Sequence, residues 1–210
     1  MVLAVMTTEE PIHPAATVVL SRDDPNGRQV LMGQRGAAAV FMPSKYVFPG
    51  GRVDDLDHGA TDHGILHDTC RRALHQDATH PLPDALPDAL VACALRELAE
   101  ETGLTLRAPK QSALRFIFRA ITPKGRSRRF DARFFLADAA DFLGDDIGFS
   151  GASDELSHLH WITLTAARGL DLPFITEVVL AEVAALFANH PQNGVPFFDN
   201  SGPISQFRRL

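Results

Sequence analysis

The sequence predicts a single domain of mixed α/β (α+β) class, in which helices cover both faces of a sheet. Short β-branched and aromatic runs are interleaved with two long helical patterns, which is typical of helix–sheet–helix layering. A length of 210 residues is the size of one domain, or of one domain with an elaboration. The hydrophobic fraction of 45% and the charged fraction of 22% exclude a largely disordered chain.

The first elements are predicted to be a strand, a turn and a second strand. Residues 15–21 and 29–35 are short apolar runs, and the Asp-Asp-Pro-Asn-Gly segment at 23–27 between them suits a tight turn. A third apolar piece at 46–49 ends in proline and runs into Gly50 and Gly51. Proline restricts that piece to a sheet edge or a strand end.

A change in composition separates these strands from the first long helix. Histidines and prolines gather between Gly59 and Pro87, where we expect a short helix over 65–76 and then a loop. A long helix is expected over 89–102, with Asp88 as its N-cap and Gly103 as its C-terminal stop.

The second half of the chain is predicted to hold three more strands and a final helix. The strands are expected over 112–122, 129–137 and 158–164, and the helix over 174–188. A basic turn at 123–129 separates the first two of these strands. The last twenty residues are rich in Pro, Gly and Asn, and they are expected to lie irregularly on the surface.

The composition also bears on partners and location. Twenty Lys and Arg against 26 Asp and Glu give a net charge of −6, which does not favour non-specific nucleic-acid binding. Two cysteines, Cys70 and Cys93, are too few for a disulfide framework or a Cys-based zinc site. No apolar run reaches the ~18 residues of a membrane span. The first residues lack the basic segment of a secretory signal, so a cytoplasmic protein is expected.

Three carboxylates occupy an unusual place on the long helix. Glu97, Glu100 and Glu101 fall within an arc of about 100° beside the apolar stripe of the helix. Like charges at these spacings repel, and the helix dipole disfavours acids in the last turn by ~0.3–1 kcal/mol. A hard cation such as Mg²⁺ or Mn²⁺ would reverse both effects, because it prefers clustered carboxylate oxygens. The alternative is a solvated acidic face.

The segment that holds these acids resembles a known motif. Residues 96–104, Arg-Glu-Leu-Ala-Glu-Glu-Thr-Gly-Leu, resemble the second half of the Nudix box, Arg-Glu-U-x-Glu-Glu-x-Gly-U, where U is aliphatic. Val47-Phe-Pro-Gly-Gly51 resembles the entry to the same motif. The resemblance covers roughly residues 15–188, and it implies an α/β/α sandwich with a central mixed sheet.

The box is split in this sequence. In the family, a glutamate stands six residues after the second glycine, and here that position is Asp57. Between Asp57 and Arg96 lie 38 residues. The resemblance therefore implies one domain over residues 1–210 with an insertion at about 59–87.

Shorter pieces resemble the coenzyme A diphosphatase-like branch of the family. Gln34-Arg35, Phe41-Met-Pro43, the diglycine and the Arg129-Phe-Asp-Ala-Arg-Phe-Phe135 segment stand in matching order. The branch implies a hydrolase that depends on Mg²⁺ or Mn²⁺ and cleaves the diphosphate of a nucleoside diphosphate derivative. The leading candidates for this substrate are coenzyme A and acyl-CoA.

Three other functions stay open at this point. They are a diphosphatase acting on ADP-ribose, NADH or another nucleotide sugar, a non-catalytic nucleotide-binding module, and a decapping activity on nucleic acid. The net charge of −6 argues against decapping, whereas the basic strip at 124–129 favours it. A homodimer is expected by analogy only.

The resemblance also implies roles for individual residues. The expected catalytic residues are Glu97, Glu100 and Glu155, with Asp154 as the alternative to Glu155. The expected metal ligands are Glu97, Glu100, Glu101 and the carbonyl of Gly51 or Gly50, and Glu97 is either a ligand or the general base. Arg96, Gly50, Gly103 and Asp57 are expected to shape the motif. Arg35, Arg129 and Arg133 are expected to bind substrate phosphate, and the alternative for each is a solvated strand face.

Two further groups carry open alternatives. His63 and His67 could bind zinc with Asp62 or His58, although such His pairs are common on exposed helices. Phe41, Tyr46 and Phe48 could stack on an adenine, and core packing would explain Phe48 equally well.

Overall fold

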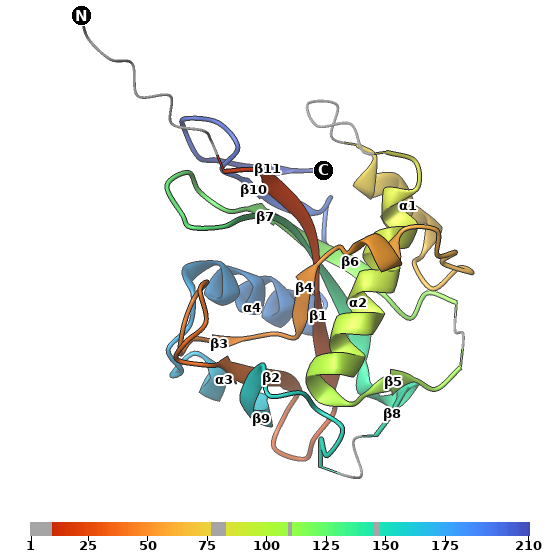
Figure 1. Ribbon diagram of the computed structural model, residues 1–210. Coiled ribbons are helices and arrows are strands. Elements are labelled where there is room, and N and C mark those ends of the chain that lie inside the picture. The colour runs from red at the N-terminus through yellow and green to blue at the C-terminus, as the bar shows by residue number, and fades with distance from the viewer. Residues whose placement is uncertain (1–9, 77–82, 109–110, 145–147) are drawn as a thin grey trace, which may run out of the picture.

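In the computed structural model, which describes residues 10–76, 83–108, 111–144 and 148–210, helices lie on both faces of one mixed sheet (Figure 1). The strands are β1 (Ile12–Arg22), β2 (Gln29–Arg35), β3 (Tyr46–Val47), β4 (Gly50–Arg52), β5 (Thr105–Leu106), β6 (Arg115–Ile121), β7 (Arg129–Asp138), β8 (Phe142–Leu143), β9 (Leu156–Thr163), β10 (Pro196–Asp199) and β11 (Gln206–Arg209). The helices are α1 (Asp68–Leu74), α2 (Leu86–Thr102), α3 (Leu164–Ala167) and α4 (Phe174–Phe187), with the 3-10 turns η1 (Asp55–Asp57) and η2 (Ala139–Asp141).

The sheet has the strand order β11-β10-β6-β7-β1-β2-β3, with β4 paired to β1 and β9 paired to β2. The long central pair, β1 and β7, is parallel from Ile12 beside Arg129 to Ser21 beside Asp138. β10 is also parallel to β6, whereas β6 and β7 are antiparallel. The central mixed sheet expected from the sequence is therefore confirmed.

β1 changes its partner partway along its length. Ser21 and Arg22 pair with β2, whereas Ala15–Thr17 pair with β4, so that Thr17 faces Gly50 and Ala16 faces Gly51. β2 and β1 thus separate toward the Arg35 end of β2. The diglycine lies in the fork that this separation creates.

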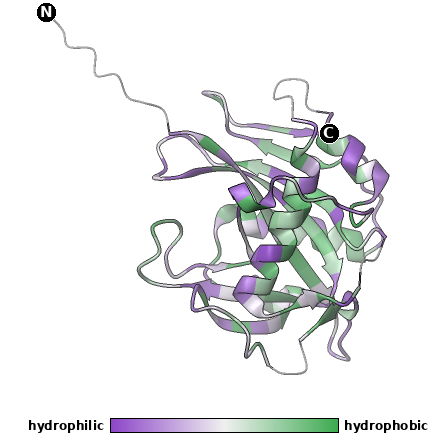
Figure 2. Cartoon of the chain, turned by 45° about the vertical axis from the view of Figure 1, so that its right-hand side comes forward, coloured by the Kyte–Doolittle hydropathy of each residue, from purple (hydrophilic) through white to green (hydrophobic). Residues whose placement is uncertain are grey.

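Two hydrophobic clusters fill the two sides of the sheet. Alternate residues of β1 point to opposite faces: Val18 and Leu20 pack with α1 and α2, and Val19 packs with α4. Figure 2 shows hydrophobic residues along the central strands and hydrophilic residues mostly on the outer turns and loops. The helix–sheet–helix layering predicted from the sequence is confirmed.

α2 ends where the sequence predicts and begins earlier. Gly103 adopts a left-handed conformation with φ 77°, and its N–H donates to the Ala99 carbonyl. The expected N-cap at Asp88 is wrong, because the helix begins at Leu86 with Ala85 as N-cap. Proline is tolerated in the first helical turn, and the Asp88 carboxylate pairs instead with Arg71 at 2.6 Å.

The other predicted elements are present with small shifts. The expected strands are seen as β1, β2, β6, β7 and β9, and the expected helices as α1 and α4. α1 is shorter than expected because the His67 side chain caps it, accepting a hydrogen bond from the Thr69 N–H. β3 forms the edge of the sheet, as proline after it requires.

The expectation of an irregular C-terminal segment is wrong. Residues 196–209 contribute β10 and β11, which extend the sheet beyond β6. Phe197 is fully buried there, and the guanidinium groups of Arg119 and Arg208 lie over its ring at 4.3 and 4.6 Å. Short strands between Pro, Gly and Asn residues leave no periodic signal, so composition alone predicts a loop.

Among the helices that the structure describes, none is both long enough and apolar enough to cross a membrane.

Candidate active site

The acidic end of α2 lies directly against the diglycine of β4. The Gly50 N–H donates to Glu101 Oε2 at 2.8 Å. A side chain at Gly51 would overlap the Glu97 carboxylate, so only glycine allows the helix to approach this closely. The fork in the sheet and the last turns of α2 therefore bring Gly50, Gly51, Glu97 and Glu101 together.

Arg96 connects the acids of α2 with Asp57 of η1, the turn that follows the diglycine strand β4. Its Nε and Nη2 donate to the two oxygens of Asp57 at 3.0 and 2.8 Å. Its Nη1 contacts Glu97 at 2.8 Å and Glu100 at 3.2 Å. The structure thus places Asp57 beside Arg96, although they are 39 positions apart in the sequence.

Asp57 is held in its charged form by this contact. Its side chain is buried, and burial alone would raise its pKa. The hydrogen bonds from Arg96 and from the Asp54 N–H outweigh burial and leave the pKa below the ordinary value. Asp57, Glu97 and Glu100 therefore share the single positive charge of Arg96.

The loop before β9 is fixed on the C-terminus of α2. The Ser153 N–H donates to the Glu100 carbonyl at 2.8 Å. Gly103 and Gly151 touch backbone to backbone, since a Cβ on Gly103 would lie 2.9 Å from Gly151 Cα. The loop that carries Asp154 and Glu155 is therefore held at the end of the acidic helix. Sequence reasoning missed Gly151 and Ser153, because neither belongs to a spaced motif.

Burial and mutual repulsion disfavour ionisation of the acids in this cluster. Glu101 is 2% exposed, and burial, together with Glu97 and Glu155, raises its pKa to about 8 despite the Gly50 N–H and Arg35. Burial, Glu100 and Glu155 also raise the pKa of Glu97, although Arg96 opposes them. Glu155, two residues after Ser153, thus contributes to the raised pKa of both helix acids.

Cys93 packs beneath the diglycine as a small buried side chain. Its Sγ lies 3.5 Å from the Gly51 carbonyl oxygen. Burial, with Asp57 and Glu97 adding to it, raises the pKa of the thiol far above its ordinary value. The thiol is therefore neutral, as expected for a packing residue.

Arg35 lies beside the start of β9. It ends β2 and pairs with Leu156 of β9, the residue after Glu155. Its charge lowers the pKa of Glu101, which places the guanidinium within electrostatic reach of that carboxylate. Its Nε is buried and makes no hydrogen bond among the described residues. Of the three arginines predicted to bind substrate, Arg35 is the one whose charge acts on an acid of the cluster.

The side chains of Arg129 and Arg133 are buried and contact other residues of the folded domain. Both side chains are 1% exposed. Arg129 donates to the carbonyls of Thr122 and Asn200, and Arg133 pairs with the Asp131 carboxylate at 2.9 Å. Strand alternation places these residues on one face, as expected, but that face is covered. The geometry gives neither guanidinium a path to a substrate phosphate.

The acids are not arranged as a closed metal site. Among the residues that the structure describes, no three Asp, Glu, His or Cys side chains converge closely enough to hold a metal ion. Glu97 and Glu100 contact Arg96, and Glu101 contacts Gly50. The chemistry of the donors nevertheless fits a hard cation, since carboxylate and carbonyl oxygens are what Mg²⁺ and Mn²⁺ prefer.

The geometry does not support a zinc site at the histidines. His63 and His67 precede α1, so their spacing is not helical. His67 Nδ1 is engaged by Thr69, and Asp62 is buried in an ion pair with Arg71. The zinc hypothesis is therefore not supported, and the expected helical position of the two histidines is wrong as well.

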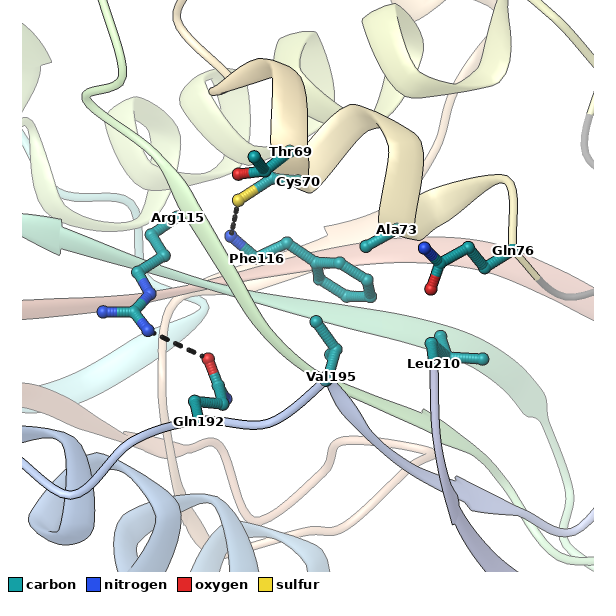
Figure 3. A pocket seen from close by; sticks show the side chains of 10 residues that line it. Thr69, Cys70, Ala73, Gln76, Arg115, Phe116, Gln192, Val195 and Leu210 are labelled. Carbon is teal, nitrogen blue, oxygen red and sulfur yellow. Dashed lines mark hydrogen bonds between the residues drawn. The ribbon is translucent and has the colours of Figure 1, made fainter.

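A separate cavity of about 270 Å³ lies between α1, β6 and the C-terminal segment (Figure 3). Phe116 N–H contacts Cys70 Sγ at 3.4 Å there, and Arg115 donates to Gln192 at 3.1 Å. None of the clustered acids lines this cavity. It is therefore not part of the candidate active site.

Solved structures share this architecture. A NUDIX hydrolase from Alicyclobacillus acidocaldarius matches with a TM-score of 0.57 and 25% identity, over 83% of this chain and 92% of that one. The NUDIX domain of Shewanella oneidensis NrtR, solved with ADP ribose, matches with a TM-score of 0.52 and 13% identity, over 88% of this chain and 94% of that one. An Ap4A hydrolase of C. elegans matches with a TM-score of 0.51 and 17% identity, over 85% and 99%. The last two show similarity of fold alone.

A curated relative is similar in sequence. The chain is 32% identical to an acyl-coenzyme A diphosphatase of Gallus gallus over 45% of its own length. The match spans 32% of that longer protein, about a third of its length. No protein-family model matches the chain.

Proposed function

We propose that this chain, which has the fold of the Nudix hydrolases and resembles their coenzyme A diphosphatase branch, is a divalent-cation-dependent diphosphatase. One observation carries the proposal: Glu97 and Glu101 of α2 meet the diglycine of β4. Glu155 contributes to the raised pKa of both acids. A cluster of acids whose pKa values are raised by burial and by one another, with the charge of Arg35 acting on it, is typical of a functional site.

Glu97, Glu100 and Glu101, with the Gly51 carbonyl, would hold Mg²⁺ or Mn²⁺. A bound divalent cation neutralises diphosphate charge and lowers the pKa of water in its reach. The buried Glu101 supplies a carboxylate that contacts no arginine among the described residues, whereas Arg96 orients Glu97 and Glu100. Burial, and after it the neighbouring carboxylates of Glu97 and Glu155, raises the pKa of Glu101, and a bound cation would favour the charged form against both.

The other roles follow from position. Glu155, or Glu97 as the alternative, accepts the proton of the water that attacks phosphorus. The water oxygen forms a bond to one phosphorus, the anhydride P–O bond breaks, and each product keeps one phosphate. Arg35 stabilises the charge that develops on the departing phosphate.

Coenzyme A or acyl-CoA is the substrate class that we propose first. The curated relative is named for acyl-coenzyme A, and the Phe41-Met-Pro43 segment supports the same branch. The alternatives are ADP-ribose, NADH or another nucleotide sugar, and a module that binds nucleotides without turnover. The Shewanella NUDIX domain was solved with ADP ribose, so this fold accommodates that ligand.

The test is a substrate panel with a matched pair of variants. The purified chain is incubated with CoA, acetyl-CoA, ADP-ribose, NADH and Ap4A, with Mg²⁺ or Mn²⁺ or with EDTA, and the products are separated by chromatography. We expect CoA to yield adenosine 3′,5′-bisphosphate and a phosphopantetheine, with no turnover in EDTA. Glu100→Gln should lower kcat at least about a hundredfold, whereas Glu177→Gln, on the exposed side of α4, should leave it unchanged.

Two results would count against the proposal. Brisk cleavage of ADP-ribose without cleavage of CoA would move the substrate to the nucleotide-sugar class. Nucleotide binding with no turnover of any compound would favour the binding module. The expected homodimer and cytoplasmic location stay predictions.

A further inference from the structure

The helix α4 is apolar on the side that faces solvent as well as on the side that faces the sheet. Of its 14 residues, three are polar, namely Thr176, Glu177 and Glu182, and Thr176 is buried. A surface helix of a monomeric domain normally carries polar and charged residues along its outer side, whereas a helix that is apolar all round is normally covered all round. The composition of α4 therefore indicates a helix with a second packing partner.

Five apolar residues form a continuous row on the outer side of α4, which we call the outer stripe. They are spaced by four, three, four and three positions and fall within an arc of about 80°, opposite the buried Val179 and Val183. Three members are exposed and two are half-buried. This alternation of four and three is the spacing of the seam between two packed helices. The outer stripe consists of Phe174, Val178, Ala181, Ala185 and Ala188.

Phe174 is the large member of the outer stripe, and its ring is held in place. It meets the ring of Phe198 edge to face with centroids 6.0 Å apart, and Phe198 lies 6.4 Å from Phe207. Phe174 is nevertheless 66% exposed, and Phe207 is 59% exposed. An aromatic ring that its neighbours already orient loses little conformational freedom when a partner covers it. Phe174 therefore has the properties of an anchor residue.

The outer stripe is complementary in shape to a second copy of itself. Its bulk lies at the N-terminal end of α4, and its last three members are alanines. If two copies pack α4 antiparallel around a two-fold axis at Ala181, Phe174 of each copy meets Ala188 of the other. A parallel pair would instead place the two phenylalanines against each other and leave space between the alanines.

The charges on α4 favour the same arrangement. Glu177 is exposed beside the outer stripe, and antiparallel packing places it across from Ala185 rather than across from Glu177 of the other copy. The helix dipoles are also aligned favourably in an antiparallel pair. α4 contains no Lys or Arg, which an anionic membrane or a nucleic acid would require of a docking helix. A second copy is therefore the occupant that the helix fits best.

The size of the patch determines how stable such a dimer can be. α4 is about 21 Å long and about 10 Å wide, so that contact along it, with the rings beside Phe174, buries on the order of 500 Å² per copy. A stable interface of standard size buries about 800 Å² per partner. We therefore expect a dimer that exchanges with the monomer at micromolar concentrations.

We propose that the outer stripe of α4 is a two-fold dimer interface in which a second copy of this chain packs its own α4 antiparallel. The sequence-based expectation of a homodimer rests on analogy, and this inference assigns the dimer a surface. It does not depend on the proposed function. α4 lies on the face of the sheet opposite α2 and its acids (Figure 1), so the interface leaves the candidate active site open.

The first test measures mass against concentration, by sedimentation velocity and light scattering from about 1 to about 500 µM. We expect the mass of the full chain to rise from 22.9 kDa toward twice that value. Ala181→Glu places two carboxylates face to face on the axis, and Phe174→Ala removes the anchor, so each should weaken the dimer at least about tenfold. The matched control is Ala166→Glu, which adds the same charge to an exposed position of α3 and should leave the dimer unchanged. Urea denaturation midpoints should be the same for all four proteins, because the substituted side chains are exposed.

The second test depends on the two-fold axis. Since residue 181 faces residue 181 of the other copy, Ala181→Glu and Ala181→Lys should each be monomeric alone, and an equimolar mixture of the two should form a heterodimer. A surface that bound any other partner would not predict this restoration.

Three results would overturn the proposal. The first is a mass of 22.9 kDa at every concentration. The second is a dimer that survives Ala181→Glu, which would place the interface on another surface. The third is a mixture of the two charged variants that stays monomeric. Flotation of the full chain with phosphatidylcholine–phosphatidylglycerol vesicles, lost in Ala181→Glu while the chain stays monomeric, would make the outer stripe a membrane contact and would also contradict the dimer.

Discussion

Glu101 is an acid of the candidate site whose burial disfavours its charged form. Its carboxylate is buried against Gly50, and burial raises its pKa to about 8 with help from Glu97 and Glu155. An unfolded chain releases the same proton near the ordinary value of 4.5. Between these two pH values the folded chain therefore binds more protons at Glu101 than the unfolded chain does.

This difference predicts how stability depends on pH. In EDTA, the free energy of unfolding should fall as the pH rises from about 5 to about 8, by roughly 2–4 kcal/mol, because each unit of pKa shift corresponds to 1.36 kcal/mol. Glu101→Gln keeps an acceptor for the Gly50 N–H and should flatten the profile. Urea denaturation at several pH values measures both proteins. Parallel profiles for the two would show that another group is responsible.

At the scale of single elements, the C-terminus of α2 determines where the loop at 148–155 lies. Gly103 ends the helix in a left-handed conformation, and its Cα touches the backbone of Gly151. The Ser153 N–H then satisfies the Glu100 carbonyl, one of the unpaired groups of the last helical turn. Helix capping and the placement of Glu155 are therefore one structural feature.

Gly103→Ala should separate these effects from simple backbone strain. Both Gly103 and Gly64 have positive φ, but only a Cβ on Gly103 would press on Gly151. We expect Gly64→Ala to cost about 1 kcal/mol of unfolding free energy. Gly103→Ala should cost clearly more, about 2–4 kcal/mol, and should also lower kcat with CoA. Denaturation and turnover assays measure the two effects. Equal costs and an unchanged kcat would show that the Gly103–Gly151 contact has no role.

At the scale of the whole molecule, the C-terminal strands are part of the core. Phe197 of β10 is buried in contact with Arg119 and Arg208, whereas Phe207 of β11 is 59% exposed. Phe197→Ala should lower the free energy of unfolding by about 3–5 kcal/mol, and Phe207→Ala by less than about 1 kcal/mol. Urea denaturation of both variants tests this. Similar small effects would mean that β10 and β11 are only attached to a sheet that is complete without them.

Local signals explain which parts of this architecture the sequence predicts. The periods of the strands and of α2, and the glycine after Thr102, are properties of neighbouring residues, and the structure bears them out. Alternation also predicts that Arg129 and Arg133 share a face of β7. It carries no information about what covers that face, and here Asp131 and Asn200 engage these side chains. The position of β10 depends on distant strands, so composition misleads there.

The contact between Asp57 and Arg96 bears on how such a motif can evolve. In polymer terms, the two residues close a loop of 39 positions, and doubling the length of such a loop costs only about 0.6 kcal/mol of chain entropy. Removing one partner of a buried ion pair costs about 3–5 kcal/mol. Selection therefore acts on the contact far more strongly than on the length of chain between its partners. A search that demands a fixed spacing between these residues will pass over relatives in which the contact itself is preserved.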